Sequence, residues 1–199
     1  MPFLFKRLVL FLSITAALAA DKEPAEFRPD AASRYPHHQT NGQVTVAADP
    51  YNTGDKVQAA FGKLNPYQYG VLPVLVVIQN DGNTAVRLDR IQAVYTGPQG
   101  DKVEATPASE VRYLRGPRRP DIVPGPTGGV KVGRTKKNPL EAWEIEGRAF
   151  AARMLPAGQT ASGFFYFQTG LQRGATLYLS GLAEATTGQE LFYYEIPLE

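Results

Sequence analysis

The chain has 199 residues, with 21 Lys or Arg, 19 Asp or Glu and no Cys. A length of this order suits one domain with a sizeable hydrophobic core. The lack of cysteine excludes disulfides, thiolate metal ligands, a cysteine nucleophile and the lipid-attachment cysteine of a bacterial lipoprotein.

The first twenty residues have the composition of a secretory signal peptide. Lys6 and Arg7 provide a basic start, Leu8–Ala20 is predominantly apolar, and Ala17–Ala19 offers the small residues that signal peptidase reads. The apolar core is too short to span a bilayer permanently. We therefore predict a signal peptide over residues 1–19, cleaved near Ala19, and a periplasmic or secreted mature protein. Retention of the leader as an anchor is the alternative.

The two basic residues of the leader account for the whole formal charge of +2, so the mature chain has no net charge. This balance gives no reason to expect nucleic acid or an anionic membrane as a partner. No second apolar stretch approaches the ~18 residues of a membrane span, so we expect no transmembrane span in the mature chain.

Residues 20–42 are polar and contain three prolines, which predicts an extended lead-in. The remaining residues, 43–199, are predicted to form a single domain. Asp55–Phe61 has the pattern of one or two helical turns. Strand candidates are the apolar or alternating runs bounded by turn residues: 43–48, 71–79, 85–88, 91–96, 102–105, 160–168, 175–184 and 190–197.

Val71–Gln79 is a continuous apolar run rich in β-branched residues. A run of this kind predicts a strand that is buried on both faces. Pro73 has no N–H to donate, so we expect it near the start of this strand or at an edge of the sheet.

A helix is predicted over residues 139–154. Asn138 is its candidate cap, Pro139 suits the first helical position, and Glu141 favours the positive end of the helix dipole. Trp143–Ala149 also alternates well enough for a strand, which stays an alternative. One apolar face is expected at helical spacing: Leu140, Trp143, Gly147, Phe150, Ala151 and Met154.

Four consecutive aromatic residues, Phe164–Phe167, must place rings on both faces of a strand. We expect Trp143, Phe150 and Met154 of the predicted helix to cover the rings on the second face. An exposed aromatic binding surface is the alternative.

About seven short strands and one helix predict a mostly β protein, an antiparallel β-sandwich. Val74–Asn80, with Gly82 and Val86–Leu88, resembles the central strand pair of bacterial exported immunoglobulin-like domains, as does Leu155–Thr160 followed by Gly163–Phe167. The resemblance covers residues 43–198. It implies export and an immunoglobulin-like β-sandwich of about seven strands with one inserted helix, and it transfers no functional residue.

No catalytic, metal or cofactor motif is complete. The adjacent histidines His37–His38 lie in the lead-in without further ligands, and neither Ser162 nor Ser180 lies in a Gly-x-Ser-x-Gly turn. The oxygen-rich turn Asp49–Asp55 lacks EF-hand spacing, and Gly125–Val132 lacks the second glycine of a phosphate loop and the hydroxyl residue that follows its lysine. We therefore expect no enzyme activity, no metal and no cofactor.

A Gly- and Pro-rich loop, residues 112–137, holds eight basic residues and one acid, and the rest of the mature chain balances it with a charge of −7. Arginine forks recognise phosphate, sulfate and carboxylate, so the loop predicts contact with a polyanion or an acidic envelope protein. A solvated loop, or one that docks on the protein's own acidic surface, is the alternative. The candidate contact residues are Arg112, Arg115, Arg118, Arg119, Lys131, Arg134, Lys136 and Lys137.

The sequence thus predicts an exported binding or structural module without catalytic activity. A periplasmic assembly factor or chaperone that pairs through a strand edge is an alternative. A third class, a carboxylate-dependent enzyme that acts on a glycan, rests on Glu141, Glu144 and Glu146 beside Trp143, because sugar sites combine paired carboxylates with an aromatic ring.

Overall fold

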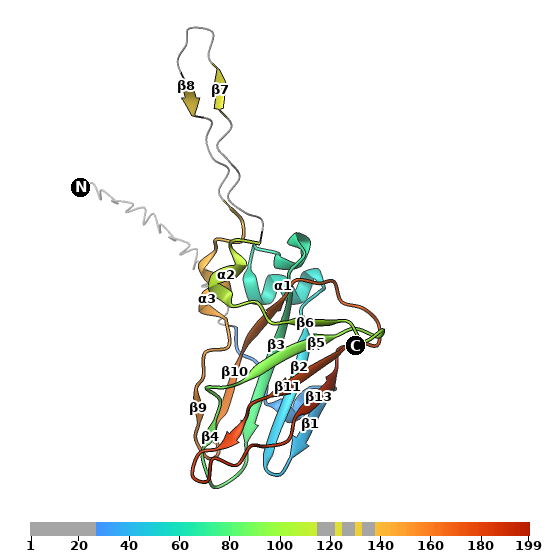
Figure 1. Cartoon of the computed structure of the whole chain (residues 1–199), viewed down its shortest axis with the longest axis vertical. Coiled ribbons are helices and arrows are strands. Elements are labelled where there is room, and N and C mark those ends of the chain that lie inside the picture. The colour runs from blue at the N-terminus through green and yellow to red at the C-terminus, as the bar shows by residue number, and fades with distance from the viewer. Residues whose placement is uncertain (1–26, 115–121, 125–129, 133–137) are drawn as a thin grey trace, which may run out of the picture.

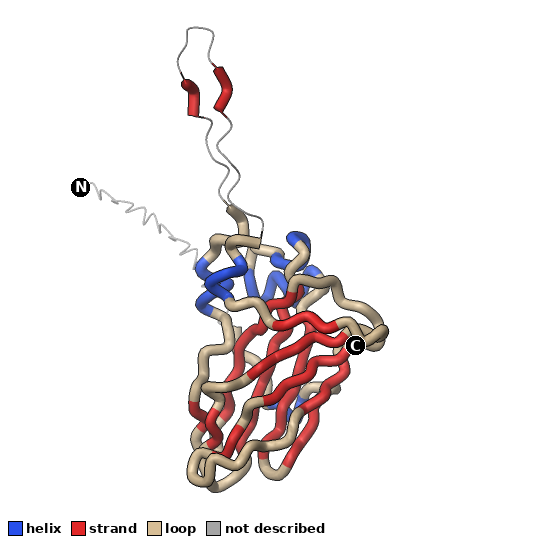
Figure 2. The backbone as a smooth tube through the Cα atoms, in the orientation of Figure 1, coloured by secondary structure: helices blue, strands red, loops and turns tan. Residues whose placement is uncertain are grey.

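The protein is mostly β, with antiparallel sheets and a few short helices, as Figures 1 and 2 show. The structure, a computed structural model, describes residues 27–114, 122–124, 130–132 and 138–199. The predicted signal peptide and most of the predicted basic loop lie outside these residues.

Two four-stranded antiparallel sheets carry most of the fold. In spatial order, the first sheet contains β1 (His38–Asn41), β2 (Val44–Pro50), β3 (Leu72–Asn80) and β10 (Thr160–Phe167). The second contains β13 (Tyr194–Pro197), β11 (Thr176–Ser180), β5 (Gln92–Thr96) and β6 (Lys102–Glu104).

Smaller elements complete the described part of the chain. A third antiparallel sheet joins β12 (Ala183–Glu184), β4 (Val86–Arg87) and β9 (Met154–Leu155), while β7 (Ile122–Pro124) and β8 (Val130–Val132) pair only with each other. The helices are η1 (Ala32–Arg34), α1 (Gly54–Phe61), η2 (Pro66–Tyr69), α2 (Ala108–Val111) and α3 (Trp143–Gly147). None of the helices in the described ranges is long and apolar enough to cross a membrane.

Strand β3 is buried on both faces, which confirms the prediction from its continuous apolar sequence. Because successive side chains point to opposite faces of a strand, Val74 and Val76 pack in a core shared with the second sheet. Leu75 and Val77 pack in a separate core, shared with the short helices and the chain around Ala32. The first sheet therefore lies between two hydrophobic cores.

The four aromatic residues of β10 divide between the two cores. Phe164 contacts the rings of Phe27, Tyr51 and Phe61 at centroid distances of 5.6, 4.9 and 4.8 Å. On the other face, Phe165 stacks on Phe150 with their ring centroids 5.3 Å apart.

The predicted aromatic cover is thus right for Phe150 and wrong for Trp143 and Met154, which are 71% and 51% exposed. The rings that cover Phe164 come instead from three segments far from it in the sequence, Phe27, Tyr51 and Phe61.

The predicted helix over residues 139–154 is also wrong in extent, because α3 spans only five residues. After α3 the chain runs beside the outer edge of β10, where Phe164 N–H donates to Arg148 O (2.9 Å) and Phe150 N–H donates to Phe164 O (3.0 Å). A Cβ on Gly163 would lie 2.4 Å from Phe150 Cα, so only glycine permits this approach. Satisfying the backbone groups of the sheet edge overrides the helical periodicity.

Two predicted boundaries also move. The polar lead-in predicted over residues 20–42 contains β1, which pairs with β2, and Ala32, which is fully buried, so the folded domain begins before residue 43. The strand predicted over residues 175–184 breaks at Gly181 (φ +82°), where a Cβ would collide with Arg90 O. The chain therefore leaves the second sheet after β11 and enters the third sheet as β12.

The buried side chain of Asn80 ties two turns together at the end of the first sheet. Its Nδ2 donates to Thr84 O (2.8 Å), Pro156 O (3.1 Å) and Leu155 O (3.2 Å), and its Oδ1 accepts from Gly82 N–H (3.0 Å). The amide therefore has a partner for each polar atom despite being only 1% exposed.

We expect Asn80→Ala to lower the free energy of unfolding by about 2–3 kcal/mol, because it leaves several backbone groups without a partner in a buried site. Chemical denaturation measures the change. Asn83→Ala, at an exposed position in the same turn, is the matched control and should change stability by less than ~0.5 kcal/mol. Equal effects of the two variants would contradict the role of Asn80.

Candidate functional site

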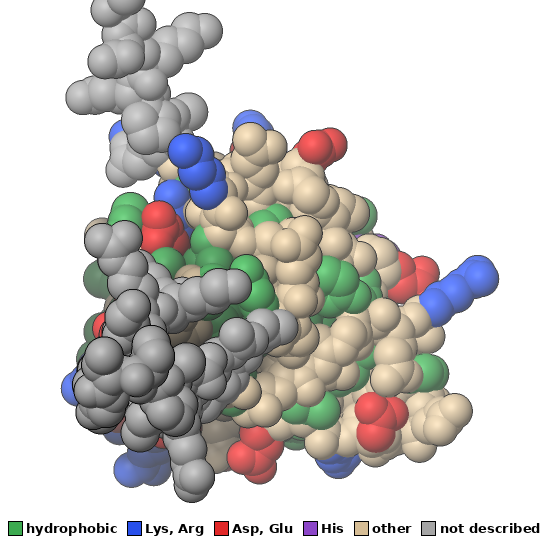
Figure 3. Space-filling view, turned by 90° about the horizontal axis from the view of Figure 1, so that it is seen from above, with side chains coloured by type: hydrophobic (Ala, Val, Ile, Leu, Met, Phe, Trp, Pro, Cys, Tyr) green, Lys and Arg blue, Asp and Glu red, His purple; other side chains and the backbone are tan. Residues whose placement is uncertain are grey.

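The helices α2 and α3 pack against each other at one end of the sheets, which we call the helical end (Figure 1). The chain leaves the described fold here at Leu114 and returns to it at Asn138. Seen from above this end, acidic and basic side chains are scattered among exposed hydrophobic ones rather than separated by sign (Figure 3). The described residues at the two ends of the predicted basic loop therefore lie at the helical end, and we call this place the root of the loop.

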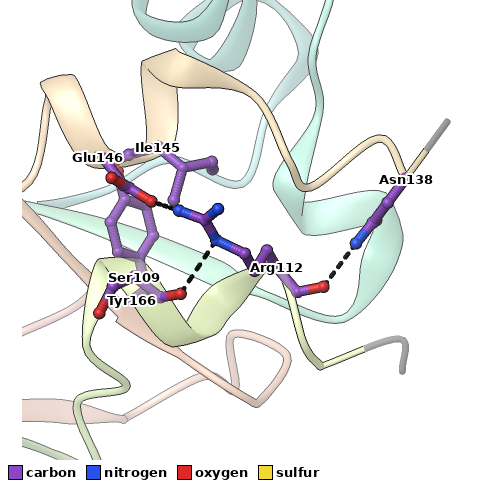
Figure 4. Close-up of polar contacts among 6 residues, drawn as sticks. All are labelled: Ser109, Arg112, Asn138, Ile145, Glu146 and Tyr166. Atoms are coloured by element: carbon purple, nitrogen blue, oxygen red, sulfur yellow. Dashed lines mark hydrogen bonds and ion pairs between the residues drawn. The ribbon is translucent and has the colours of Figure 1, made fainter. Parts of the chain in front are cut away.

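Arg112 is held within the protein (Figure 4). Its guanidinium pairs with the Glu146 carboxylate, its Nε donates to Ser109 O (3.2 Å), and it lies 6.0 Å from the centroid of the Tyr113 ring. Both side chains of the ion pair are partly exposed, so the pair contributes at most about 1 kcal/mol. Arg112 therefore fastens α2 to α3 and is not a free cation.

The side chains of the other seven predicted contact residues are not described in the structure. Lys131 lies on β8, whose side chains are not described. The remaining six lie outside the described residues: Arg115, Arg118, Arg119, Arg134, Lys136 and Lys137.

Asn138 closes the root of the basic loop (Figure 4). Its Nδ2 donates to Arg112 O (2.5 Å), across 26 positions of sequence, and its Oδ1 accepts from the N–H of the buried Leu140 (3.1 Å). Asn138 therefore caps the turn before α3. The helix itself begins after Ala142, which makes no side-chain cap, so the predicted role of Asn138 as a helix cap is corrected.

Tyr166 attaches α3 to the first sheet. Its hydroxyl donates to Ile145 O (2.7 Å), and both residues are buried. Burial raises the pKa of Tyr166 well above its ordinary value, since the tyrosinate would lose hydration, and the nearby Arg148 offsets only part of this effect. The hydroxyl is thus a protonated donor that holds α3 against the first sheet.

A shallow cleft of about 360 Å³ lies between β5, the chain after β6, and β10. Another, of about 300 Å³, lies at the opposite end, beside Asn80 and the exposed Phe192.

His38 is exposed on β1, and its Nδ1 lies 2.7 Å from Tyr35 O. Within the described ranges, no three His, Asp or Glu side chains gather as a metal site would require.

A third cleft, of about 230 Å³, lies at the helical end, and we call it the Trp143 cleft. Glu141 and Glu146 line it, whereas Glu144 does not. Sequence reasoning placed Trp143 in the core, although the three glutamates around it indicate a solvated position. The complete lining is Ala108, Arg112, Leu140, Glu141, Ala142, Trp143, Ile145 and Glu146.

No protein-family model matches the chain, and no curated protein matches it either. Among solved structures, it is similar to the yjhA protein from Bacillus subtilis, with 12% identity, a TM-score of 0.40, and coverage of 81% of this chain and 96% of that one. It is also similar to a functionally unknown protein from Listeria monocytogenes, with 11% identity, a TM-score of 0.34, and coverage of 81% of this chain and 80% of that one.

Proposed function

We propose that this protein is an exported, non-catalytic binding module that contacts a polyanion or an acidic envelope protein through residues 115–137, here called the basic segment. The proposal rests on one observation: the two ends of the basic segment are joined by a hydrogen bond. Asn138 donates to Arg112 O, so the basic segment starts and ends at one point of the fold. The segment holds seven Lys or Arg and a single acid. All of its charge therefore lies between two residues that meet at the helical end.

Arg112 has a different role in this proposal from the one that its charge predicts. Its guanidinium is engaged by Glu146 and its backbone carbonyl by Asn138. It anchors the root, and the partner contacts the seven cations beyond it. The Arg112–Glu146 ion pair is the kind of contact that the seven cations of the basic segment would make if the segment docked on the protein's own acids, which is the competing account.

Pairing of a partner through a strand edge has less support, because several edges are occupied. The outer edge of β10 bonds to Thr106 and Phe150. On the opposite side, Gln39 Oε1 accepts from Glu195 N–H (2.8 Å) and Asn41 Nδ2 donates to Tyr193 O (3.1 Å), which joins β1 to β13. These side-chain bonds occupy backbone groups that an added strand would need.

The immunoglobulin-like architecture and export belong to the same proposal. Two four-stranded antiparallel sheets around a shared core support a sandwich. Export rests on the leader, residues 1–19. The intact mass of protein recovered from the periplasm or medium should lack the leader, and a mass equal to that of the full chain would overturn cleavage.

Binding to immobilised heparin and to a poly-glutamate peptide tests the proposed contact. We expect binding at ~0.01 M salt that falls steeply by ~0.15 M, where the Debye length shortens from ~30 to ~8 Å. Replacing Arg115, Arg118, Arg119 and Arg134 by Gln should abolish binding and leave the melting temperature nearly unchanged. If this quadruple variant melts several degrees lower, the segment pairs with the protein's own acids and the proposal fails.

The matched control removes the same charge elsewhere. Lys63, Arg90, Arg153 and Arg173 are exposed, and none of them belongs to the basic segment. Replacing these four by Gln should leave most of the binding in place. A loss equal to that of the first variant would attribute binding to total charge and not to the basic segment.

A further inference from the structure

Trp143 presents an aromatic face to solvent at a fixed position. It is the only tryptophan of the chain and is 71% exposed. One edge of its indole lies on Gly147, where a Cβ would come within 3.1 Å of Cε3 and 3.2 Å of Cζ3. The ring is therefore supported from its own helix. Exposing so much apolar surface forgoes the ~1.5–3 kcal/mol that burial of a large apolar side chain provides.

Polar groups surround this ring. The carboxylate of Glu141 is exposed on the wall of the Trp143 cleft, and the Arg112–Glu146 ion pair lies in the same cleft. Carboxylate oxygens accept hydrogen bonds, and the guanidinium donates them. The cleft thus combines a flat apolar face with acceptors and donors at its side.

The charge and the volume of the Trp143 cleft limit the classes of ligand that can bind in it. Two acids, Glu141 and Glu146, line the cleft against one cation, Arg112, which is paired with Glu146, so an anionic lipid surface would meet repulsion here. A volume of about 230 Å³ is below the ~300–1,000 Å³ of sites for drug-sized ligands, which suits a single ring. Among ring-shaped ligands, a pyranose matches the cleft, because its C–H face stacks on an aromatic ring while its hydroxyls bond to carboxylates.

We propose that the Trp143 cleft binds one neutral pyranose unit of a polysaccharide, with the sugar stacked on Trp143 and its hydroxyls bonded to Glu141. The proposal deepens the proposed function by naming a partner class, a glycan whose anionic groups meet the basic segment. Only this link to the basic segment rests on the proposed function, since the stacking site uses described residues alone.

Fluorescence of the single tryptophan reports directly on the site. We titrate the protein with neutral hexasaccharides of glucose, mannose and N-acetylglucosamine, which offer no charge to the basic segment. At least one should cause saturable quenching. Glu141→Ala should weaken that binding by about tenfold, the size of one charge-assisted hydrogen bond. In calorimetry, Trp143→Ala should weaken it by at least about tenfold.

Phe192→Ala is the matched control, because Phe192 is 81% exposed but lines a different cleft at the opposite end, and the affinity of this variant should match that of the parent protein. All three replaced side chains are exposed, so the variants should fold with an unchanged melting temperature. If no hexasaccharide quenches the fluorescence, or if Trp143→Ala binds as the parent does, the proposal is overturned.

Two further results separate this proposal from the proposed function. If the parent protein binds no neutral hexasaccharide while both it and Trp143→Ala bind heparin equally well, the sugar site is overturned and the basic segment remains as the contact. A blue shift of the fluorescence with vesicles of phosphatidylglycerol, but not with sugars, would assign Trp143 to a lipid surface and overturn the proposal in the same way.

Discussion

The rest of the structure depends on the burial of β3 on both faces. A strand in this position cannot leave either face to solvent, so the chain must supply two sets of apolar partners. The second sheet supplies one set, around Val74 and Val76. The N-terminal segment and the short helices supply the other, around Leu75 and Val77. Since α2 and α3 contribute Val111 and Ile145 to this second core, the hydrophobic effect fixes the helical end against the sheet.

From this constraint the candidate site follows through a short series of contacts. Phe164 and Tyr166 on β10 lie in the second core, and the Tyr166 hydroxyl holds Ile145 of α3. The next residue of α3, Glu146, holds Arg112, whose carbonyl is bound by Asn138. The sheet therefore positions the root of the basic segment and the Trp143 cleft through the same helix, so that both lie at one end of the molecule.

Local patterns in the sequence predicted the elements that depend on local physics. The continuous apolar run of Val71–Gln79 predicted a doubly buried strand, and Asp55–Phe61 predicted a helix that the structure has as α1. The helix over residues 139–154 failed because its spacing competes with backbone bonds to β10, a partner beyond the local sequence. At the site, charge alone identified the basic loop. Charge could not predict that Glu146 engages Arg112, since this contact depends on how α2 packs against α3. The glutamates around Trp143 did indicate a solvated position, but the helical spacing predicted the opposite.

The unfolding free energies of Val76→Thr and Val77→Thr, measured side by side, test the central claim most directly. Each substitution keeps the shape and the β-branch and replaces a methyl by a hydroxyl. The two neighbouring side chains, 0% and 1% exposed, point into different cores. If β3 is buried on both faces, each variant should lose about 1–3 kcal/mol. A loss for Val76→Thr with no change for Val77→Thr would contradict the account, because the second core and the helical end attached to it would then not be packed against the sheet.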